Sequence, residues 1–175
     1  MKLGYFASRR QTVARVFPNI QSKRILVSNK PGIGILLPPP TELLSNPDFT
    51  ASITGWTPFN CTAAWVAGGL ARLTATGGLA QFWSDITVPT TEILAILMNA
   101  RVATGTSSWS WQFENPIGTG AGGSSGSSNS STFTTLSRSI DASAGTARLI
   151  FYGNNPVIGD TYEIDFASMK VEAPL

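Results

Sequence analysis

From residue 57 onward, apolar and polar residues alternate in short runs that are separated by Gly, Pro, Ser and Asn. Alternation with a period of two predicts β-strands, because successive side chains of a strand point to opposite faces. Long stretches lack Glu, Lys and Gln at helical spacing, which argues against helices. The predicted strands cover residues 57–66, 70–76, 79–87, 91–103, 107–114, 132–140, 146–153 and 161–172.

Turn-forming residues lie between several of these strands. Gly68-Gly69 and Gly77-Gly78 stand where hairpin turns are needed. Many short strands joined by such turns predict an all-β fold, an antiparallel β-sandwich of the jelly-roll type rather than a parallel sheet. Residues 118–131 (GTGAGGSSGSSNSS) are of low complexity, and their composition predicts a flexible loop.

The first 41 residues have a different pattern. Residues 1–22 have no clear period and predict an extended arm, whereas residues 23–37 predict a hairpin around Pro31-Gly32, a pair suited to a type II turn. Pro38-Pro39-Pro40 then favours a stiff polyproline II spacer. The expected domains are therefore a basic N-terminal arm with hairpin and Pro-rich linker over 1–41, and a β-sandwich over 42–175.

The net charge of the chain changes sign at the same boundary. Residues 1–41 contain seven basic residues and no acidic residue, and the first acid of the chain is Glu42. The whole chain has 12 basic and 10 acidic residues, so the other 134 positions hold five basic and ten acidic ones. This asymmetry predicts that the arm binds a negatively charged partner. The expected contact residues are Arg9, Arg10, Arg15, Lys23, Arg24 and Lys30.

Composition argues against catalysis and membrane insertion. The chain contains no His, which removes the usual general base and the commonest metal ligand. Cys61 is the only cysteine, so no intrachain disulfide can form, and a small buried side chain is expected there. Glu163 and Asp165 lack further marks of a glycosidase pair. The most apolar run, residues 93–98, is far shorter than the ~20 residues that cross a bilayer, so a soluble protein is expected. The missing His and the absence of catalytic motifs predict a protein that is no enzyme.

Tryptophans supply the candidate binding residues of the body. Trp109, Trp111 and Phe113 alternate in SWSWQFE, so they share one face of a strand. Burial in the core is the favoured interpretation, and a row of rings that stacks on a glycan is the alternative. Phe82 and Trp83 are adjacent and must point in opposite directions, so one of them lies on the outer face or at an interface. Trp83 is the candidate for that exposed position.

Two segments resemble a known family. Residues 43–57 (LLSNPDFTASITGWT) are similar to the opening of galactose-binding and carbohydrate-binding-module-like jelly rolls, in which a Leu-Asn-Gly/Pro-Asp-Phe phrase precedes Gly-Trp. Residues 162–171 (YEIDFASMKV) resemble the closing strand of these domains. The resemblance implies a sandwich over residues 42–172, with Phe49 and Trp56 in the core and the last strand beside the opening segment.

The same resemblance bears on calcium. Some members of the family bind a structural calcium ion between the first and last strands, and Asp165 occupies the matching closing position. The acidic residue often found after the opening Phe is Thr50 in this chain. Because Ca²⁺ prefers six to eight oxygen ligands, a calcium site near Asp165 is not favoured, and no cofactor is expected.

A basic arm before such a domain resembles bacteriophage virion proteins that decorate or cement a capsid. This resemblance implies a non-enzymatic virion protein, whose partner is the major capsid protein or another virion protein and which forms a dimer or trimer. The arm would bind an acidic shell, and the hairpin could add strands to a neighbouring sheet edge.

Two other functions are open from the sequence. The first is a glycan-binding, tail- or fibre-associated adhesin module, with Trp83 or the Trp109–Trp111 row as its platform. The second is an internal virion protein whose arm contacts nucleic acid. Tyr5, Phe6 and Phe17 are too few and too irregular to form a stacking platform, which argues against the second.

Overall fold

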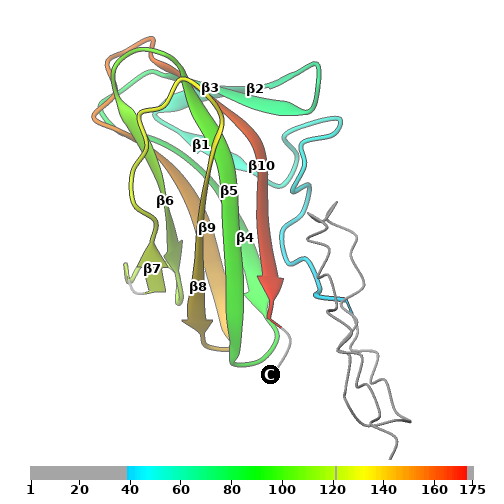
Figure 1. The fold of residues 1–175 in the computed structure, drawn as a ribbon. Coiled ribbons are helices and arrows are strands. Elements are labelled where there is room, and N and C mark those ends of the chain that lie inside the picture. The colour runs from blue at the N-terminus through cyan, green and yellow to red at the C-terminus, as the bar shows by residue number, and fades with distance from the viewer. Residues whose placement is uncertain (1–38, 121, 173–175) are drawn as a thin grey trace, which may run out of the picture. The chain divides into compact units, whose positions relative to one another are not determined.

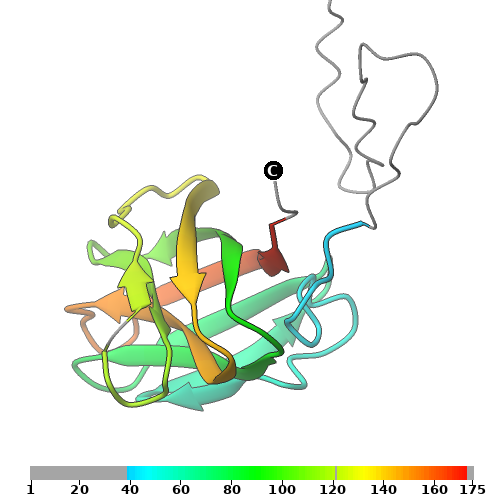
Figure 2. The same ribbon diagram turned by 90° about the horizontal axis from the view of Figure 1, so that it is seen from below.

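The computed structural model describes residues 39–120 and 122–172. From Pro40 onward the chain forms one compact unit, distinct from Met1–Pro39. This unit consists of two five-stranded antiparallel sheets that pack face to face (Figures 1 and 2). The predicted all-β sandwich is therefore confirmed. Within the described ranges there is no helix long and apolar enough to cross a membrane.

The chain crosses repeatedly between the two sheets. One sheet has the order β1-β4-β9-β6-β7, and the other has the order β2-β3-β10-β5-β8. Each of the eight predicted strand ranges overlaps at least one observed strand. The strand bounds are β1 Thr57–Phe59, β2 Cys61–Val66, β3 Leu70–Ala75, β4 Ala80–Val88, β5 Glu92–Thr104, β6 Ser108–Glu114, β7 Gly122–Ser124, β8 Thr134–Ala142, β9 Gly145–Asn154 and β10 Thr161–Val171.

The core lies between the two sheets and contains the inward residues that alternation predicts. Trp109, Trp111 and Phe113 of β6 are all completely buried. The Trp109 ring stacks on Phe151 of β9, with ring centroids 5.8 Å apart and planes inclined by 15°. Large aromatic side chains bury much apolar area, so this layer stabilises the contact between the sheets.

The segment before β1 closes one side of the core, as the resemblance implies. Phe49 and Trp56 are 0% and 6% exposed, and both contact Phe82 through their rings. The same segment runs beside the last strand, because the Leu43 N–H donates to the Met169 carbonyl at 2.9 Å. The opening and closing segments of the unit are thus neighbours.

Three details differ from the sequence expectations. Residues 57–66 form two strands, because Asn60 adopts a positive φ of 51° and the chain passes from one sheet to the other. Gly68-Gly69 forms the predicted turn between β2 and β3, but Gly77-Gly78 joins strands of different sheets and is no hairpin turn. Residues 118–131 were expected to form a flexible loop, but β7 lies within this segment and pairs with β6.

A bulge in β10 changes which side chains share a face. The register shifts between Ile164 and Phe166, so Asp165 is the extra residue. Tyr162 and Ile164 are completely buried, whereas Phe166 is only partly buried. Ala167 takes the next inward position instead. Strict alternation would place Phe166 on the buried face with Tyr162 and Ile164, and the bulge removes it from that face.

Candidate functional site

The outer surface of the sheet β1-β4-β9-β6-β7 gathers polar and aromatic side chains. Antiparallel pairing aligns its outward residues in cross-strand rows, one through Trp83, Ile150 and Gln112 and a neighbouring one through Gln81, Tyr152 and Ser110. We call this surface the Trp83 face. Its outward residues are Thr57, Phe59, Gln81, Trp83, Asp85, Arg148, Ile150, Tyr152, Ser110, Gln112 and Glu114.

Trp83 lies partly exposed on β4 of this surface, whereas the adjacent Phe82 is completely buried. The guanidinium carbon of Arg148 lies 4.8 Å from the centre of the Trp83 ring. The Phe59 ring, itself 49% exposed, lies 6.3 Å from it at an angle of 48°. These two contacts fix the orientation of the indole before any ligand binds.

Arg148 is held in turn by Asp85. Its Nε donates to Asp85 Oδ1 at 2.6 Å and its Nη2 donates to Asp85 Oδ2 at 2.9 Å. These hydrogen bonds raise the pKa of Arg148 above its ordinary value, so it is positively charged throughout the physiological range. The pair neutralises its own charge, and Glu114 in the same row adds one negative charge to the surface.

Hydrogen-bonding groups surround the aromatic residues. Burial, followed by the negative charge of Glu114, raises the pKa of Tyr152, and Arg148 offsets part of this rise. Tyr152 therefore carries a neutral hydroxyl that can both donate and accept. The Asn154 amide nitrogen donates to Ser110 Oγ at 3.1 Å. The surface can thus offer ring faces, amides and hydroxyls together.

The structure separates the tryptophans proposed from the sequence. Trp83 faces outward as predicted, on a strand whose alternation is regular. Trp109 and Trp111 are completely buried, so they cannot stack on a glycan, and their alternation reflects burial in the core. Tyr152 and Arg148 were not singled out from the sequence. The alternation of β9 could have found them, because both occupy its outward positions.

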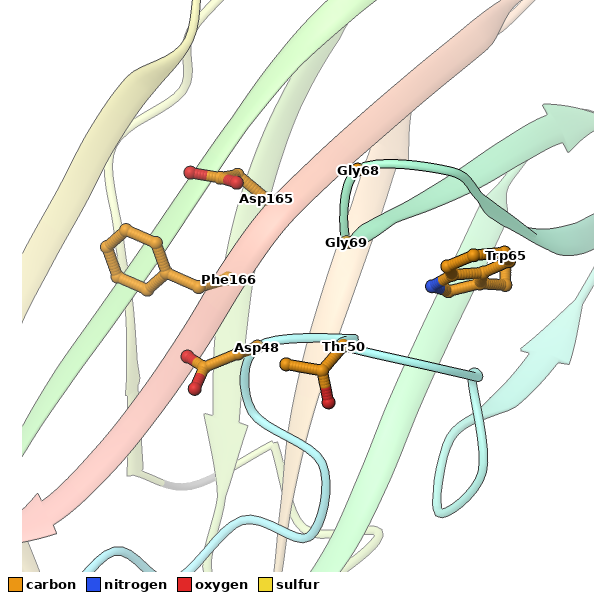
Figure 3. Close-up of a pocket in the computed structure, with 7 residues that line it drawn as sticks. All are labelled: Asp48, Thr50, Trp65, Gly68, Gly69, Asp165 and Phe166. Atoms are coloured by element: carbon orange, nitrogen blue, oxygen red, sulfur yellow. The ribbon is translucent and has the colours of Figure 1, made fainter.

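A second feature is an open cavity of about 460 Å³ at the other sheet. Its lining residues come from the segment before β1, from β2 and its turn into β3, and from the bulge of β10. They are Asp48, Thr50, Trp65, Gly68, Gly69, Asp165 and Phe166 (Figure 3).

This cavity tests the calcium expectation at Asp165. Two carboxylates and one hydroxyl of the lining supply fewer oxygen ligands than Ca²⁺ prefers. Residues 39–120 and 122–172 also contain no cluster of three or more His, Cys, Asp or Glu side chains that could hold a metal ion. The side chains present thus do not fit a calcium site well.

The other residues singled out from the sequence belong neither to the Trp83 face nor to the cavity lining. The Cys61 thiol donates to the Gln81 carbonyl at 3.2 Å, and burial raises its pKa, so it is a neutral structural thiol. Glu163 is a buried carboxylate that pairs with the partly exposed Arg72 and Arg101 rather than with Asp165. The arm residues Arg9, Arg10, Arg15, Lys23, Arg24 and Lys30 and the hairpin lie outside the described residues.

Comparisons with known proteins identify the fold. No protein-family model and no curated protein matches the sequence. Among solved structures, the chain is similar to the CBM22-1 xylan-binding domain from Paenibacillus barcinonensis Xyn10C, with a TM-score of 0.57 and 16% identity over 77% of this chain and 97% of that one.

Two further structures have the same architecture. The N-terminal cellulose-binding domain from Cellulomonas fimi β-1,4-glucanase C matches with a TM-score of 0.58 and 11% identity over 77% of this chain and all of that one. TmCBM61, solved in complex with β-1,4-galactotriose, matches with a TM-score of 0.55 and 12% identity over 75% and 99% of the two chains. At these identities the likeness establishes a carbohydrate-binding-module-like sandwich. It carries no information on a virion, so the predicted virion location and capsid partner stay predictions.

Proposed function

We propose that the unit from Pro40 onward is a non-enzymatic glycan-binding module, and that the Trp83 face is its binding surface. The observation that carries the proposal is the position of Trp83, a partly exposed indole held by Arg148 among hydrogen-bonding side chains on one sheet face. The similarity to xylan-binding, cellulose-binding and galactotriose-bound domains supports the same class of ligand.

The chemistry of the face suits a sugar chain. A pyranose ring has an apolar C–H face that can pack on an indole, and a rim of hydroxyls that needs both donors and acceptors. Gln81, Gln112 and Tyr152 lie in the rows that contain or adjoin Trp83, and they supply both. An enzyme would need a pair of carboxylates tuned for proton transfer, whereas Asp85 is bound to Arg148 through both oxygens.

Glycan binding is tested by titrating the full chain with soluble xylan, cello-oligosaccharides and β-1,4-galactotriose in a calorimeter. We expect at least one of them to bind, and we expect Trp83→Ala to weaken that binding by about tenfold or more, which corresponds to about 1.4 kcal/mol. The proposal fails if Trp83→Ala binds every ligand as the unsubstituted chain does.

Phe133→Ala is the matched control. Phe133 is also a partly exposed aromatic residue, with 36% of its surface accessible, but it packs on Arg101 of β5 in the other sheet. Its removal is expected to leave glycan affinity unchanged. Equal losses in the two variants would indicate a general effect on the fold rather than a contact with the ligand.

A second function rests on the charge of residues 1–41. We propose that the seven basic residues of this segment attach the chain to an acidic protein surface, such as a virion shell. Many copies would turn weak individual contacts into firm attachment. Neutral substitution of Arg9 and Arg10 is expected to weaken attachment, mainly at raised salt.

The attachment test compares what the full chain and a version without residues 1–40 retain from particles or lysate of the source. A shell protein that only the full chain retains, in a salt-dependent manner, is the expected result. Polysaccharide retained equally by both versions would assign attachment to the sandwich instead. Salt-independent attachment would contradict the electrostatic role of the arm.

A further inference from the structure

The connection between β9 and β10 carries the two most exposed large apolar side chains among the described residues. Val157 is 67% exposed and its neighbour Ile158 is 74% exposed. The connection lies at one end of the sandwich, coloured orange at the upper left of Figure 1. We call residues 155–160 the apolar tip. Contiguous apolar groups on a surface mark an interaction site, so the tip calls for a partner.

Hydrogen bonds hold the tip in one conformation. The Asp160 N–H donates to the Val157 carbonyl at 2.9 Å and closes a turn. The Gly159 N–H donates to the Ala75 carbonyl, and the Ala75 N–H donates to the Asp160 carbonyl, both at 2.9 Å. The tip is thus fastened to the end of β3. Its two apolar side chains project from a fixed support, which lowers the entropy cost of binding.

The same turn satisfies most of its own N–H groups. Pro156 has no N–H, and the Val157 N–H donates to Asp160 Oδ2 at 3.1 Å. With the N–H groups of Gly159 and Asp160 bound as well, Ile158 is the only one of these residues whose N–H has no partner within the described part of the chain. A segment that enters hydrocarbon must satisfy its N–H groups internally, whereas a loop in water can bind solvent instead.

The tip and the connections beside it carry almost no charge. The β3–β4 connection, residues 76–79, and the β5–β6 connection, residues 105–107, contain no charged residue. Within the tip only Asp160 is charged, and it is 8% exposed with its carboxylate bound to the Val157 N–H. Leu79, 39% exposed, adds an aliphatic side chain next to the tip. Charged side chains are costly in a bilayer, so an end without exposed charge fits a lipid surface.

The type of side chain favours lipid over protein. The residues that contribute most to protein–protein binding are Trp, Tyr and Arg, whereas Leu and Val are under-represented there. The large side chains of the tip are aliphatic, and they project from a convex turn. Two such turns would bury far less area against each other than a stable dimer needs. A lipid surface deforms around a convex apolar group and needs no matching pocket.

We propose that the apolar tip inserts into the surface of a lipid bilayer whose headgroups carry no net charge. Val157 and Ile158 would enter the boundary between headgroups and acyl chains, with Leu79 beside them. This is a peripheral contact and differs from a membrane span, which needs about 20 apolar residues. The proposal does not rest on glycan binding, since the tip shares no residue with the Trp83 face.

A contact through so few side chains is weak. One myristoyl chain binds a bilayer with an association constant of only about 10⁴ M⁻¹, and the tip offers no more hydrocarbon than such a chain. We therefore expect reversible binding at millimolar lipid. Several copies on one membrane would strengthen the attachment.

The test is sedimentation of the full chain with phosphatidylcholine vesicles, which have no net charge. At about 0.5 M salt, attraction between the basic residues 1–41 and the headgroups is screened. We expect the bound fraction to rise with lipid and to saturate. The double variant Val157→Ser and Ile158→Ser is expected to bind about tenfold or more weakly, because it loses the transfer of two aliphatic side chains from water.

Two further variants make the test specific. Ile93→Ser removes a 48% exposed aliphatic side chain near the start of β5, whose other end adjoins the tip, and it is expected to leave vesicle binding unchanged. Val157→Leu with Ile158→Leu keeps the tip apolar and is expected to bind as the unsubstituted chain does. Thermal unfolding of each variant confirms that it is folded.

Three results would overturn the proposal. The first is no saturable binding to phosphatidylcholine vesicles, including the case in which only anionic vesicles bind. The second is binding that the double serine variant retains in full. The third is a concentration-dependent dimer in sedimentation velocity that this variant loses while the vesicles stay unbound, which would assign the tip to a contact between two copies. None of them bears on the Trp83 face, which the calorimetric titration tests.

Discussion

At the scale of single residues, Glu163 is the most constrained charge of the described unit. Its side chain is 2% exposed and lies in one cross-strand row with Arg72 and Arg101, which are 48% and 35% exposed. Arg72 Nε donates to Oε1 at 2.9 Å and Arg101 Nε donates to Oε2 at 2.8 Å. The two arginines compensate a buried carboxylate that would otherwise be costly.

Glu163→Gln is expected to destabilise the fold by about 1–3 kcal/mol, because it removes the charge and leaves part of the arginine hydrogen bonding unsatisfied. Burial alone would raise the pKa of Glu163, but the hydrogen bonds from Arg72 and Arg101 outweigh it and hold the pKa below its ordinary value. Stabilisation by this carboxylate is therefore present at neutral pH and is lost as the pH falls through the lowered pKa.

Thermal unfolding of both proteins from pH 7 to pH 3 measures this dependence. The difference between their unfolding midpoints should be largest at neutral pH and should shrink as the pH falls through the lowered pKa of Glu163. Asp141→Asn provides the control for loss of an exposed acid. A difference that stays constant over the whole range would contradict the role of the charge.

Gly105 is constrained by its conformation and by a neighbour. Its φ is +106°, and a Cβ atom there would lie 2.2 Å from Asp160 Oδ1. Asp160 is 8% exposed and accepts the Val157 N–H, so it has little freedom to move. Gly105→Ala should therefore cost more than the roughly 1–2 kcal/mol of an unfavourable backbone conformation.

Denaturant unfolding of Gly145→Ala separates the cost of the backbone conformation from the cost of the contact with Asp160. Gly145 has a similar φ of +127°, but a Cβ atom there would meet nothing within 4 Å. We expect Gly105→Ala to be the more destabilising of the two. Equal losses would show that Asp160 makes room and that only backbone strain matters.

At the scale of elements, β6 and β4 show how one residue type serves two purposes. Trp111 of β6 is completely buried, and its Nε1 donates to the Leu136 carbonyl at 3.2 Å. Trp83 of β4 points away from the core and contacts Arg148 and Phe59 at the surface. The two tryptophans differ in exposure because Trp111 occupies an inward position of its strand and Trp83 an outward one.

Trp111→Ala is thus expected to lower the free energy of unfolding by about 3–5 kcal/mol, because it leaves a large cavity between the sheets. Trp83→Ala should cost clearly less, since the ring is partly exposed and its removal opens no cavity in the core. Urea titrations followed by far-ultraviolet circular dichroism compare the two. Similar costs would show that Trp83 is structural rather than a binding residue.

Much of this element pattern could be predicted from the sequence. Alternation located the strands and assigned Trp109 and Trp111 to the core and Trp83 to the surface, because burial in a sandwich follows a period of two. The switch of sheets at Asn60 and the bulge at Asp165 could not be predicted. Both are single-residue changes of backbone conformation that the tertiary contacts select, and they leave the local hydrophobic pattern almost unchanged.

The candidate site could be predicted only in part, for a related reason. Trp83 could be found because it stands beside Phe82 on one strand. Tyr152 and Arg148 become its neighbours only when β9 pairs with β4 in the observed register, and the sequence of one strand does not specify its partner. The cavity beside Trp65 similarly joins three segments that are distant in sequence.

At the scale of the whole molecule, the described unit presents different chemistry on its two sheets. The Trp83 face offers an aromatic platform with amides and a neutralised ion pair, and the other sheet carries the Trp65 cavity and the Glu163 cluster. The basic segment 1–41 adds a third region of opposite charge to the body. The proposed glycan binding and the proposed attachment rest on these separate regions.

The most direct test of glycan binding locates the bound sugar on the molecule. Amide and indole NMR signals of the full chain are recorded with increasing amounts of whichever of xylan fragments, cello-oligosaccharides or β-1,4-galactotriose binds in the calorimeter. The account predicts saturable shifts for the indole of Trp83 and for residues of β4, β9 and β6 that face outward beside it. Shifts that leave these residues unchanged, or no saturable shift with any of the three, would contradict it.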